Sequence, residues 1–407
     1  MKHVTGTLLF AFMACVTIAQ KTVVNPYASV DKKMLEIPAA QTTSTAAIAQ
    51  YVQSNFTHNT DKARAIFIWT ASSISYDLDN MFAINFYEKK EDKINKALTT
   101  HKGICENYAE VFTDICIKAG IPSYVVVGYT RQSGFTDYIP HAWCAAFIDT
   151  AWRLFDPTWG SGYVANKKFI KKIDNRYCLA QPSAMIKTHM PFDYLWQFLY
   201  FPVTNQAFYE GKTQVQNNNQ YFMFRDSIVV YEQLDSIGQL QAAARRIEQN
   251  GIKNSMIFDR LHHIRAQLEV YEQQQKIKQQ NERQTRIASL YNGSIASYNT
   301  GINAYNNFIA FRNAQFLPAQ PDTAIQNMLN NAATHFNNAK NQLAAISQPD
   351  ENLANLVSQQ QKALQDIMGR MQEQQDWLQL YFSKPKNKRK AMFYEKKTSW
   401  LGIPINQ

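Results

Sequence analysis

The stretch Gly103-Ile104-Cys105-Glu106-Asn107-Tyr108-Ala109 places a cysteine at the start of a predicted helix. Apolar residues follow Cys105 at helical spacing, and Gly120 with Pro122 marks the end of the pattern. These signals predict a helix from about Cys105 to Ala119 with the thiol in its first turn. The first-turn N–H groups of a helix are unpaired and its dipole is positive there. A thiolate is therefore stabilised at Cys105, and the backbone N–H is available to an oxyanion.

Two predicted strands downstream bring a histidine close to an aspartate. The segments from Trp143 to Ile148 and from Trp152 to Phe155 indicate a hairpin, with His141 opening the first strand and Asp156 closing the second. Cross-strand neighbours on one face lie roughly 5 Å apart, so the Asp156 carboxylate can orient the His141 imidazole. A base held in this way activates a cysteine nucleophile. The pattern pairs the histidine with the aspartate but does not place Cys105 against them.

Each of the three residues also has an ordinary structural interpretation. A cysteine in an apolar helix is usually a buried small hydrophobe, but Gly103 before Cys105 and the polar Glu106-Asn107 after it favour an exposed thiol. A histidine such as His141 is also common at the start of a strand, and an aspartate before proline, as at Asp156, is typical of a turn. Cysteine and histidine also bind zinc, but no C-x-x-C or H-x-x-x-H spacing occurs, so no metal or cofactor is expected.

Further motifs surround these residues, namely Lys62-Ala63-Arg64-Ala65-Ile66-Phe67-Ile68-Trp69, Ile74-Ser75-Tyr76-Asp77, Ala119-Gly120-Ile121-Pro122, Val127-Gly128-Tyr129, His141-Ala142-Trp143 and Trp152 with Asp156-Pro157-Thr158-Trp159-Gly160. Together they resemble the transglutaminase-like superfamily, and more narrowly its kyphoscoliosis-peptidase-type bacterial branch. The resemblance covers roughly residues 61–162, with a weaker continuation through 191–197.

The resemblance implies an α+β, papain-like core in which the helix bearing the cysteine packs on an antiparallel sheet. It implies that Cys105 is the nucleophile, that His141 is the general base and acid, and that Asp156 orients the imidazole. The oxyanion would be stabilised by the Cys105 N–H and one upstream side chain, for which Tyr76 and Trp69 are the candidates. No cofactor is implied.

The chemistry expected from such a triad is attack on an amide carbonyl of a peptide or protein through a thioester. Water resolves the thioester in hydrolysis, which we expect, whereas an amine resolves it in a cross-linking transamidation. The alternative from another class is a non-catalytic interaction or scaffold protein of the cell envelope that keeps the fold for binding. Asn107, where relatives often have glycine, and Cys144, after His-Ala-Trp, depart from the family pattern without touching the triad.

The first residues predict a secretory signal peptide over residues 1–19. A positive start at Lys2 is followed by an apolar run from Leu8 to Ile18 that is too short to span a bilayer. Small residues then allow cleavage after Ala19. We therefore expect a secreted or periplasmic protein. Lipoprotein processing at Cys15 is the weaker alternative, because the residues before it match a lipobox poorly.

The cysteines left after such cleavage do not predict a disulfide framework. Cys105 and Cys116 are about 16 Å apart along one helix, beyond the roughly 7 Å that a disulfide allows. An oxidising compartment would allow one disulfide among three cysteines, Cys116, Cys144 and Cys178. We expect these three to be free, buried thiols.

The chain of 407 residues is too long for one compact core, and its composition shifts after about Gln206 from aromatic and mixed to Gln, Asn, Ala and charged residues. We expect a linker and first helix over 20–45, a transglutaminase-like domain over 46–205, a connector over 206–235, a helical domain over 236–383 and a basic tail over 384–407.

The helical domain is expected to be an all-α bundle or coiled coil, because apolar stripes at helical spacing alternate with stop signals. The expected helices run from Ser236 to Gln249, from near Asn254 onward, over about Asp322–Ile346 and over about Asp350–Phe382. A glutamine run begins at Gln273 within the second of these. It has two interpretations, a transamidation substrate and an ordinary solvated helix face, and the second is the more common.

The formal net charge of +10 comes partly from the basic tail, Lys384 to Lys390. A secreted protein without a nucleic-acid reader motif is not expected to bind nucleic acid. An anionic envelope polymer or membrane surface is a candidate partner for the tail, and a solvated tail is the simpler interpretation. The sequence leaves the oligomeric state and the identity of the peptide or protein substrate open.

Overall fold

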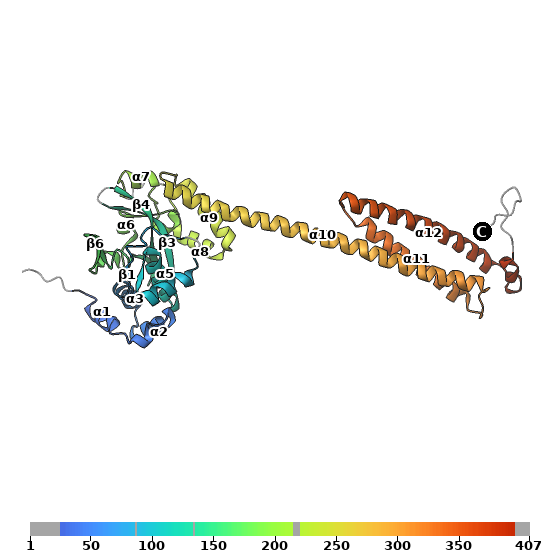
Figure 1. Cartoon of the computed structure of the whole chain (residues 1–407), viewed down its shortest axis with the longest axis horizontal. Helices are drawn as coiled ribbons and strands as arrows, with labels where there is room; N and C mark the ends of the chain where they lie inside the picture. The colour runs from blue at the N-terminus through green and yellow to red at the C-terminus, as the bar shows by residue number, and fades with distance from the viewer. Residues whose placement is uncertain (1–24, 86–87, 133–134, 215–219, 395–407) are drawn as a thin grey trace, which may run out of the picture. The chain divides into compact units, whose positions relative to one another are not determined.

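The computed structural model describes residues 25–85, 88–132, 135–214 and 220–394. It divides into two compact units, Met1–Glu269 and Val270–Gln407 (Figure 1). The predicted signal peptide, residues 1–19, and the lipoprotein alternative at Cys15 lie outside the described residues. Within the described ranges, no helix is both long enough and apolar enough to cross a membrane.

The first unit combines helices with small sheets. Its helices are α1 (Ala28–Leu35), α2 (Thr45–Asn55), α3 (Asn59–Ser73), α4 (Lys90–Thr100), α5 (Cys105–Lys118), α6 (Pro182–Met185), α7 (Asn205–Tyr209), α8 (Phe224–Gln233) and α9 (Ser236–Gln249). Its strands are β1 (Ser75–Tyr76), β2 (Lys102–Gly103), β3 (Ser123–Gln132), β4 (Phe135–Ile148), β5 (Ala151–Phe155), β6 (Gly162–Ala165), β7 (Lys168–Lys171) and β8 (His189–Pro191). The central sheet is antiparallel, in the order β5-β4-β3-β8. The α+β core with a cysteine-bearing helix is therefore confirmed.

The helix α5 begins at Cys105 as predicted. The side-chain oxygen of Asn107 accepts a hydrogen bond of 2.9 Å from the N–H of Ile104, which fixes the first turn. The helix ends at Lys118, and Gly120 follows with a φ of 85°. Glycine adopts this left-handed conformation without strain, so the end of the helix was readable from the sequence.

The predicted hairpin is formed by β4 and β5. Cys144 pairs with Phe155, and Ile148 pairs with Ala151 next to the turn. Asp149 in this turn has a φ of 57°, which aspartate tolerates better than most residues. This register brings Asp156 within reach of His141, as the sequence predicted.

One expectation about this hairpin was wrong. His141 does not open its strand, because β4 begins at Phe135. Pro140 looked like a strand boundary, since proline has no N–H to donate to a ladder. It is accommodated here because β4 pairs only with β3 at this point and pairs with β5 from Cys144 onward, and because the register of β3 shifts after Tyr129.

Alternate residues of β4 face opposite sides of the sheet. Ala142, Cys144 and Ala146 pack with α3 and α5 in one buried cluster. Trp143 and Ala145 pack on the other side with Leu195, Phe198 and two residues of α8. The central sheet thus lies between two apolar layers, and α5 covers the face nearest to Cys105.

The short strand β8 completes the sheet beside β3. Gly128 of β3 pairs with His141 on one side and with Pro191 on the other. A Cβ atom at position 128 would lie 2.1 Å from the Met190 carbonyl oxygen. Glycine therefore permits the close approach of β3 and β8, the strand that begins with His189.

The division of the chain differs from the boundary expected at residue 236. The helix α9 and the first part of α10 (Ser255–Asn313) belong to the first unit, which extends to Glu269. Their side chains Ile247, Ile257 and Ile264 share a buried cluster with Phe192, next to β8. The composition changes near residue 206, but these helices retain an apolar face that packs on the sheet.

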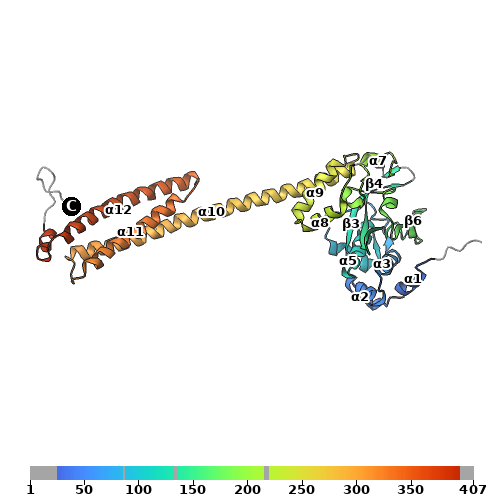
Figure 2. The ribbon, with the colours of Figure 1, turned by 180° about the vertical axis from the view of Figure 1, so that it is seen from behind.

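The second unit is all-α from Val270 to Tyr394, the part that the structure describes, as predicted. It contains the remainder of α10, α11 (Asp322–Ala344), α12 (Glu351–Ser383) and the short 3-10 segment Lys386–Phe393. These helices run side by side in both views of the ribbon (Figure 1 and Figure 2). They enclose an apolar core that includes Phe308, Phe336 and Leu378. In the run that begins at Gln273, Gln275 is half-buried and the other glutamines are exposed.

Candidate active site

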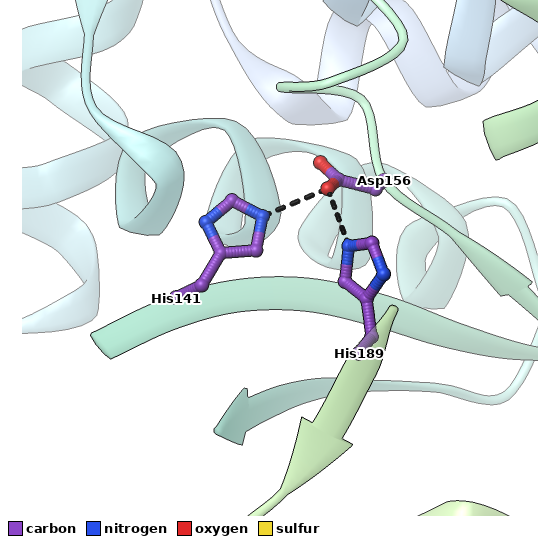
Figure 3. Close-up of side chains that lie close together, drawn as sticks. All are labelled: His141, Asp156 and His189. Carbon is purple, nitrogen blue, oxygen red and sulfur yellow. Dashed lines mark hydrogen bonds and ion pairs between the residues drawn. The ribbon is translucent and has the colours of Figure 1, made fainter. Parts of the chain in front are cut away.

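The carboxylate of Asp156 is the centre of the buried polar cluster in the first unit. It follows the last residue of β5 and is fully buried. Its Oδ1 accepts hydrogen bonds from the backbone N–H groups of Thr158, at 2.9 Å, and of Trp159, at 3.0 Å. Its Oδ2 lies 2.8 Å from His141 Nε2 and 3.0 Å from His189 Nε2 (Figure 3). Burial alone would raise the pKa of this carboxyl, but the two histidines hold it well below its usual value.

His141 reaches Asp156 from β4, as the hairpin register predicted. Because an ionised carboxylate only accepts hydrogen bonds, His141 Nε2 carries a proton in this arrangement. Burial opposes a charge on the imidazole. The negative charge of Asp156, its hydrogen bond and the interaction with Cys105 nevertheless raise the pKa of His141 above its usual value. The other ring nitrogen, Nδ1, lies on the far side of the ring from Asp156 (Figure 3) and is the one left for the thiol.

Cys105 lies near enough to His141 for its thiol to contribute to the raised pKa of the imidazole. The first residue of α5 therefore lies beside this histidine, where the sequence alone did not place it. The thiol is only 4% exposed, so the expectation of an exposed cysteine was wrong. The polar residues that suggested exposure are buried too, because they have partners inside the protein.

Those partners come from α4. Glu106 forms an ion pair with Lys93 at 3.1 Å, and the side chains of both residues are buried. The Asn107 amide nitrogen donates a hydrogen bond of 3.0 Å to the backbone oxygen of Lys93. Polar residues beside Cys105 thus fasten the start of α5 to α4 instead of exposing it to solvent. The fixed helix start holds the thiol in place.

His189 is the site residue that sequence reasoning missed. It is 1% exposed, and it reaches the same carboxylate oxygen from β8 that His141 reaches from β4 (Figure 3). Thr188 Oγ1 lies 2.8 Å from its Nδ1. The signal in the sequence is weak, a single histidine at the start of a three-residue strand. Only the pairing of β8 with β3 brings it to Asp156.

A cleft of about 990 Å³ opens beside this cluster. His141, Thr158 and Trp159 line it on the side of this cluster. The hairpin of β6 and β7 lines it with apolar side chains that include Tyr163 and Phe169. The volume is in the range of about 300–1,000 Å³ that is usual for ligand sites, and the cleft gives a substrate access to the His141 side of the cluster.

A helix-borne thiol, a histidine and a carboxylate in this order along the chain are combined here with an antiparallel sheet. The same part of the chain, residues 46–157, matches the transglutaminase-like superfamily. This chain carries a transglutaminase-like domain. The match ends one residue after Asp156 and includes Cys105 and His141.

Several proteins are similar to this chain over part of its length. Kyphoscoliosis peptidase of Mus musculus is 33% identical over 156 residues, which are 36% of this chain and 23% of that protein. Hillarin of Drosophila melanogaster is 27% identical over 188 residues, which are 41% of this chain and 22% of that protein. The chain therefore spans only about a quarter of the length of these relatives. Among solved structures, the periplasmic domain of TgpA from Pseudomonas aeruginosa is 20% identical and covers 34% of this chain and 49% of that chain, with a TM-score of 0.24.

The two candidate oxyanion residues occupy different places in the transglutaminase-like domain. Tyr76 of β1 lines the cleft. Burial, followed by the charges of Cys105 and Asp156, raises the pKa of Tyr76 to about 12, so its hydroxyl stays protonated and able to donate. Trp69 of α3 is 4% exposed and packs in the apolar core with Cys105 and its neighbours. The placement favours Tyr76 as the donor.

The cluster of His141, Asp156 and His189 also has the residue types of a metal site. One ligand atom from each lies within 4.8 Å of the others. The short N···O distances of 2.8 and 3.0 Å are those of hydrogen bonds, and the protons on the two Nε2 atoms account for them. A metal ion at this position would displace both protons and would take His141 from the thiol. The donor set can hold a cation, but the geometry fits a hydrogen-bonded site better.

Proposed function

We propose that the transglutaminase-like domain is a cysteine hydrolase that cleaves amide bonds of peptides or proteins. The observation that carries this proposal is the position of His141, whose Nε2 is bound to Asp156 and whose Nδ1 faces away from that carboxylate (Figure 3), with Cys105 near enough to contribute to its raised pKa. A base so held between an acceptor and a nucleophile is the arrangement of a catalytic triad. A protein that kept the fold only for binding would not need this geometry beside a cleft.

In the proposed mechanism, His141 Nδ1 takes the proton of the Cys105 thiol. The thiolate attacks the amide carbonyl carbon, and the carbonyl oxygen becomes an oxyanion. The N–H of Cys105, which has no partner within its helix, and the hydroxyl of Tyr76 donate to that oxygen. Asp156 remains ionised throughout and stabilises the imidazolium of His141.

The protonated His141 then donates its Nδ1 proton to the leaving amine, and the C–N bond breaks to give a thioester on Cys105. Water enters, His141 takes one of its protons, and the hydroxide attacks the thioester carbonyl. The thiolate leaves as the carboxylic acid product forms. If an amine replaced water in this second step, the same residues would carry out a transamidation.

We also propose that the protein works in an extracellular or envelope space, which rests on the N-terminal sequence alone. Its basic segment offers three exposed lysines, Lys386, Lys388 and Lys390, to an anionic polymer or lipid surface. Arg389 in the same segment is instead bound to Asp322 at 2.8 Å. The lysines are therefore the part available for such a contact.

The proposal is tested by the rate at which iodoacetamide alkylates Cys105 in the full chain, located by peptide mapping. At about pH 6, where an ordinary thiol of pKa about 8.5 is almost entirely protonated, wild type should react rapidly. His141→Ala should react at least about tenfold more slowly, because the imidazolium partner of the thiolate is gone. His262→Ala, at an exposed histidine of α10, is the matched control. Equal slow rates in all three proteins would refute the proposal.

Hydrolysis and transamidation are separated by the fate of an acyl donor. Dye-labelled casein is incubated with wild type and with Cys105→Ala, with and without dansylcadaverine. The proposal expects Cys105-dependent release of small peptides. Cys105-dependent incorporation of the amine without peptide release would instead assign the transamidase activity.

A further inference from the structure

His189 is a second histidine on the carboxylate of the proposed triad, and the mechanism above does not use it. Its Nε2 lies 3.0 Å from Asp156 Oδ2, the oxygen that also accepts from His141. It does not line the cleft, whereas His141 does. A residue so placed acts on the reaction through Asp156 and not through the substrate.

The protons on this imidazole follow from its neighbours. Because Asp156 is ionised and only accepts, His189 Nε2 must carry a proton and donate it. Burial disfavours a second proton and lowers the pKa of His189, against the hydrogen bond and charge of Asp156. The Nδ1 atom therefore accepts a hydrogen bond from the Thr188 hydroxyl at 2.8 Å. The Met185 carbonyl oxygen, at 3.4 Å, is the more distant acceptor for that hydroxyl.

Aromatic rings hold His189 in this orientation. The ring of Trp159 lies edge-on with centroids 4.6 Å apart, and that of Trp143 likewise at 5.1 Å. The charged groups that face it are Asp156 and His141, with Asp137 contributing a weaker charge. The imidazole is thus locked by packing on its sides and by hydrogen bonds at both nitrogens.

We propose that His189, held by Thr188, is a positioning residue that fixes the Asp156 carboxylate so that His141 presents Nδ1 to Cys105. The inference rests on the proposed function and deepens it. With His189 in place, the carboxylate accepts four hydrogen bonds, two on each oxygen. Without it, Oδ2 loses a donor in a buried place and the space beside it opens, so the carboxylate turns away from His141.

Three substitutions test this role. His189→Leu removes both ring nitrogens and retains an apolar side chain. His189→Gln retains a neutral N–H donor near the position of Nε2. Thr188→Val leaves the imidazole in place and removes only the hydroxyl that donates a hydrogen bond to its Nδ1. His262→Leu, at an exposed histidine of α10, is the control for loss of a histidine as such.

The measurement is the rate of Cys105 alkylation by iodoacetamide from about pH 5 to about pH 9, with thermal unfolding recorded for each variant. We expect His189→Leu to lose about tenfold or more of the rate at the acid end, the size of one charge-assisted hydrogen bond. The dependence of its alkylation rate on pH should approach that of an ordinary thiol. His189→Gln should stay within about threefold of wild type, and Thr188→Val should fall between them.

The outcomes separate this inference from the proposed function. If wild type itself shows no His141-dependent rate at the acid end, the proposed function fails. If wild type shows it and His189→Leu matches wild type, the positioning role alone is overturned. An equal loss of alkylation rate in His189→Gln and His189→Leu, with unfolding temperatures unchanged, would also overturn it. The shape of the imidazole ring, and not its N–H donor, would then be the cause.

Discussion

The two units of this chain bury different kinds of side chain. The first encloses charged and polar groups, among them Asp156, His189 and Arg64, each no more than 1% exposed. In the described part of the second unit, Ser294 is the buried polar residue, and it donates to the Ala339 carbonyl oxygen at 3.0 Å. The other buried residues described there are hydrophobic.

The difference shows what each unit demands of its sequence. A helical bundle needs apolar residues at the right spacing, and many substitutions of similar volume satisfy it. A buried polar cluster needs each donor opposite its acceptor, because a buried group left without a partner is costly. Small displacements should therefore damage the first unit more than the second.

The largest contrast is expected between two glycines. Gly128→Ala would place a Cβ 2.1 Å from the Met190 carbonyl oxygen and 2.6 Å from Pro191 Cα, both backbone atoms of β8. Since no side-chain rotation relieves this, it should destabilise the first unit by about 4 kcal/mol. Gly369→Ala in α12 meets nothing within 4 Å and should stabilise the second unit by about 0.5–1 kcal/mol. Hydrogen exchange in peptides from each unit measures both. Similar small effects at the two positions would contradict the account.

A second contrast concerns buried polar contacts. Arg246 of α9 binds Asp193 through two hydrogen bonds of 2.7 and 2.8 Å, with both side chains largely buried. Arg246→Met removes two charge-assisted hydrogen bonds from the buried carboxylate, which keeps the Leu195 N–H and the charge of Arg260, and should cost about 3 kcal/mol. Ser294→Ala in the second unit removes one neutral hydrogen bond and should cost about 1 kcal/mol. The exchange rates of α9 and α11 amides report the two losses, and an equal cost would break the comparison.

A smaller effect is expected from acid. Because the pKa of Asp156 lies below the ordinary value of 3.8 in the folded protein, its stabilising contribution is present above that value and is lost as the pH falls below it. The free energy of unfolding of the first unit should therefore drop by about 1 kcal/mol from about pH 5 to about pH 3. Asp156→Asn should lower the stability at about pH 5 and flatten this slope. Urea unfolding at each pH measures it, and parallel slopes for the two proteins would argue against the assignment.

At His141, stability is lost when the pH rises and not when it falls. Its pKa is raised from 6.5, so its contribution is complete below that value and is lost as the pH rises toward the folded-state pKa. His141→Ala should remove this alkaline loss while leaving the acid slope of Asp156 smaller but present. An unchanged alkaline slope in His141→Ala would show that another group causes it.

The local parts of the site were readable from the sequence. Helix-stop residues located the end of α5, and the hairpin turn gave the register that pairs His141 with Asp156. The helices of the second unit followed from apolar spacing and from prolines. Each of these signals acts over a few residues, where spacing and turn chemistry decide the structure.

The rest depended on contacts between distant segments. His189 joins the cluster through the pairing of β8 with β3, which nothing within a three-residue strand specifies. Cys105 is buried because Glu106 has a partner, Lys93, on another helix. The unit boundary lies at Glu269 because α9 packs on the sheet. In each case the deciding partner lies far away in the sequence.

The central claim is that Cys105 and His141 form a thiolate–imidazolium pair beside Asp156. It is tested most directly by thiolate absorbance at about 240 nm against pH, as the difference between wild type and Cys105→Ser, with His141→Ala measured alongside. We predict thiolate absorbance already at about pH 6 in wild type, where an ordinary thiol of pKa about 8.5 is almost entirely protonated, and its loss in His141→Ala. Thiolate that appears only near about pH 8.5 in both proteins would contradict it.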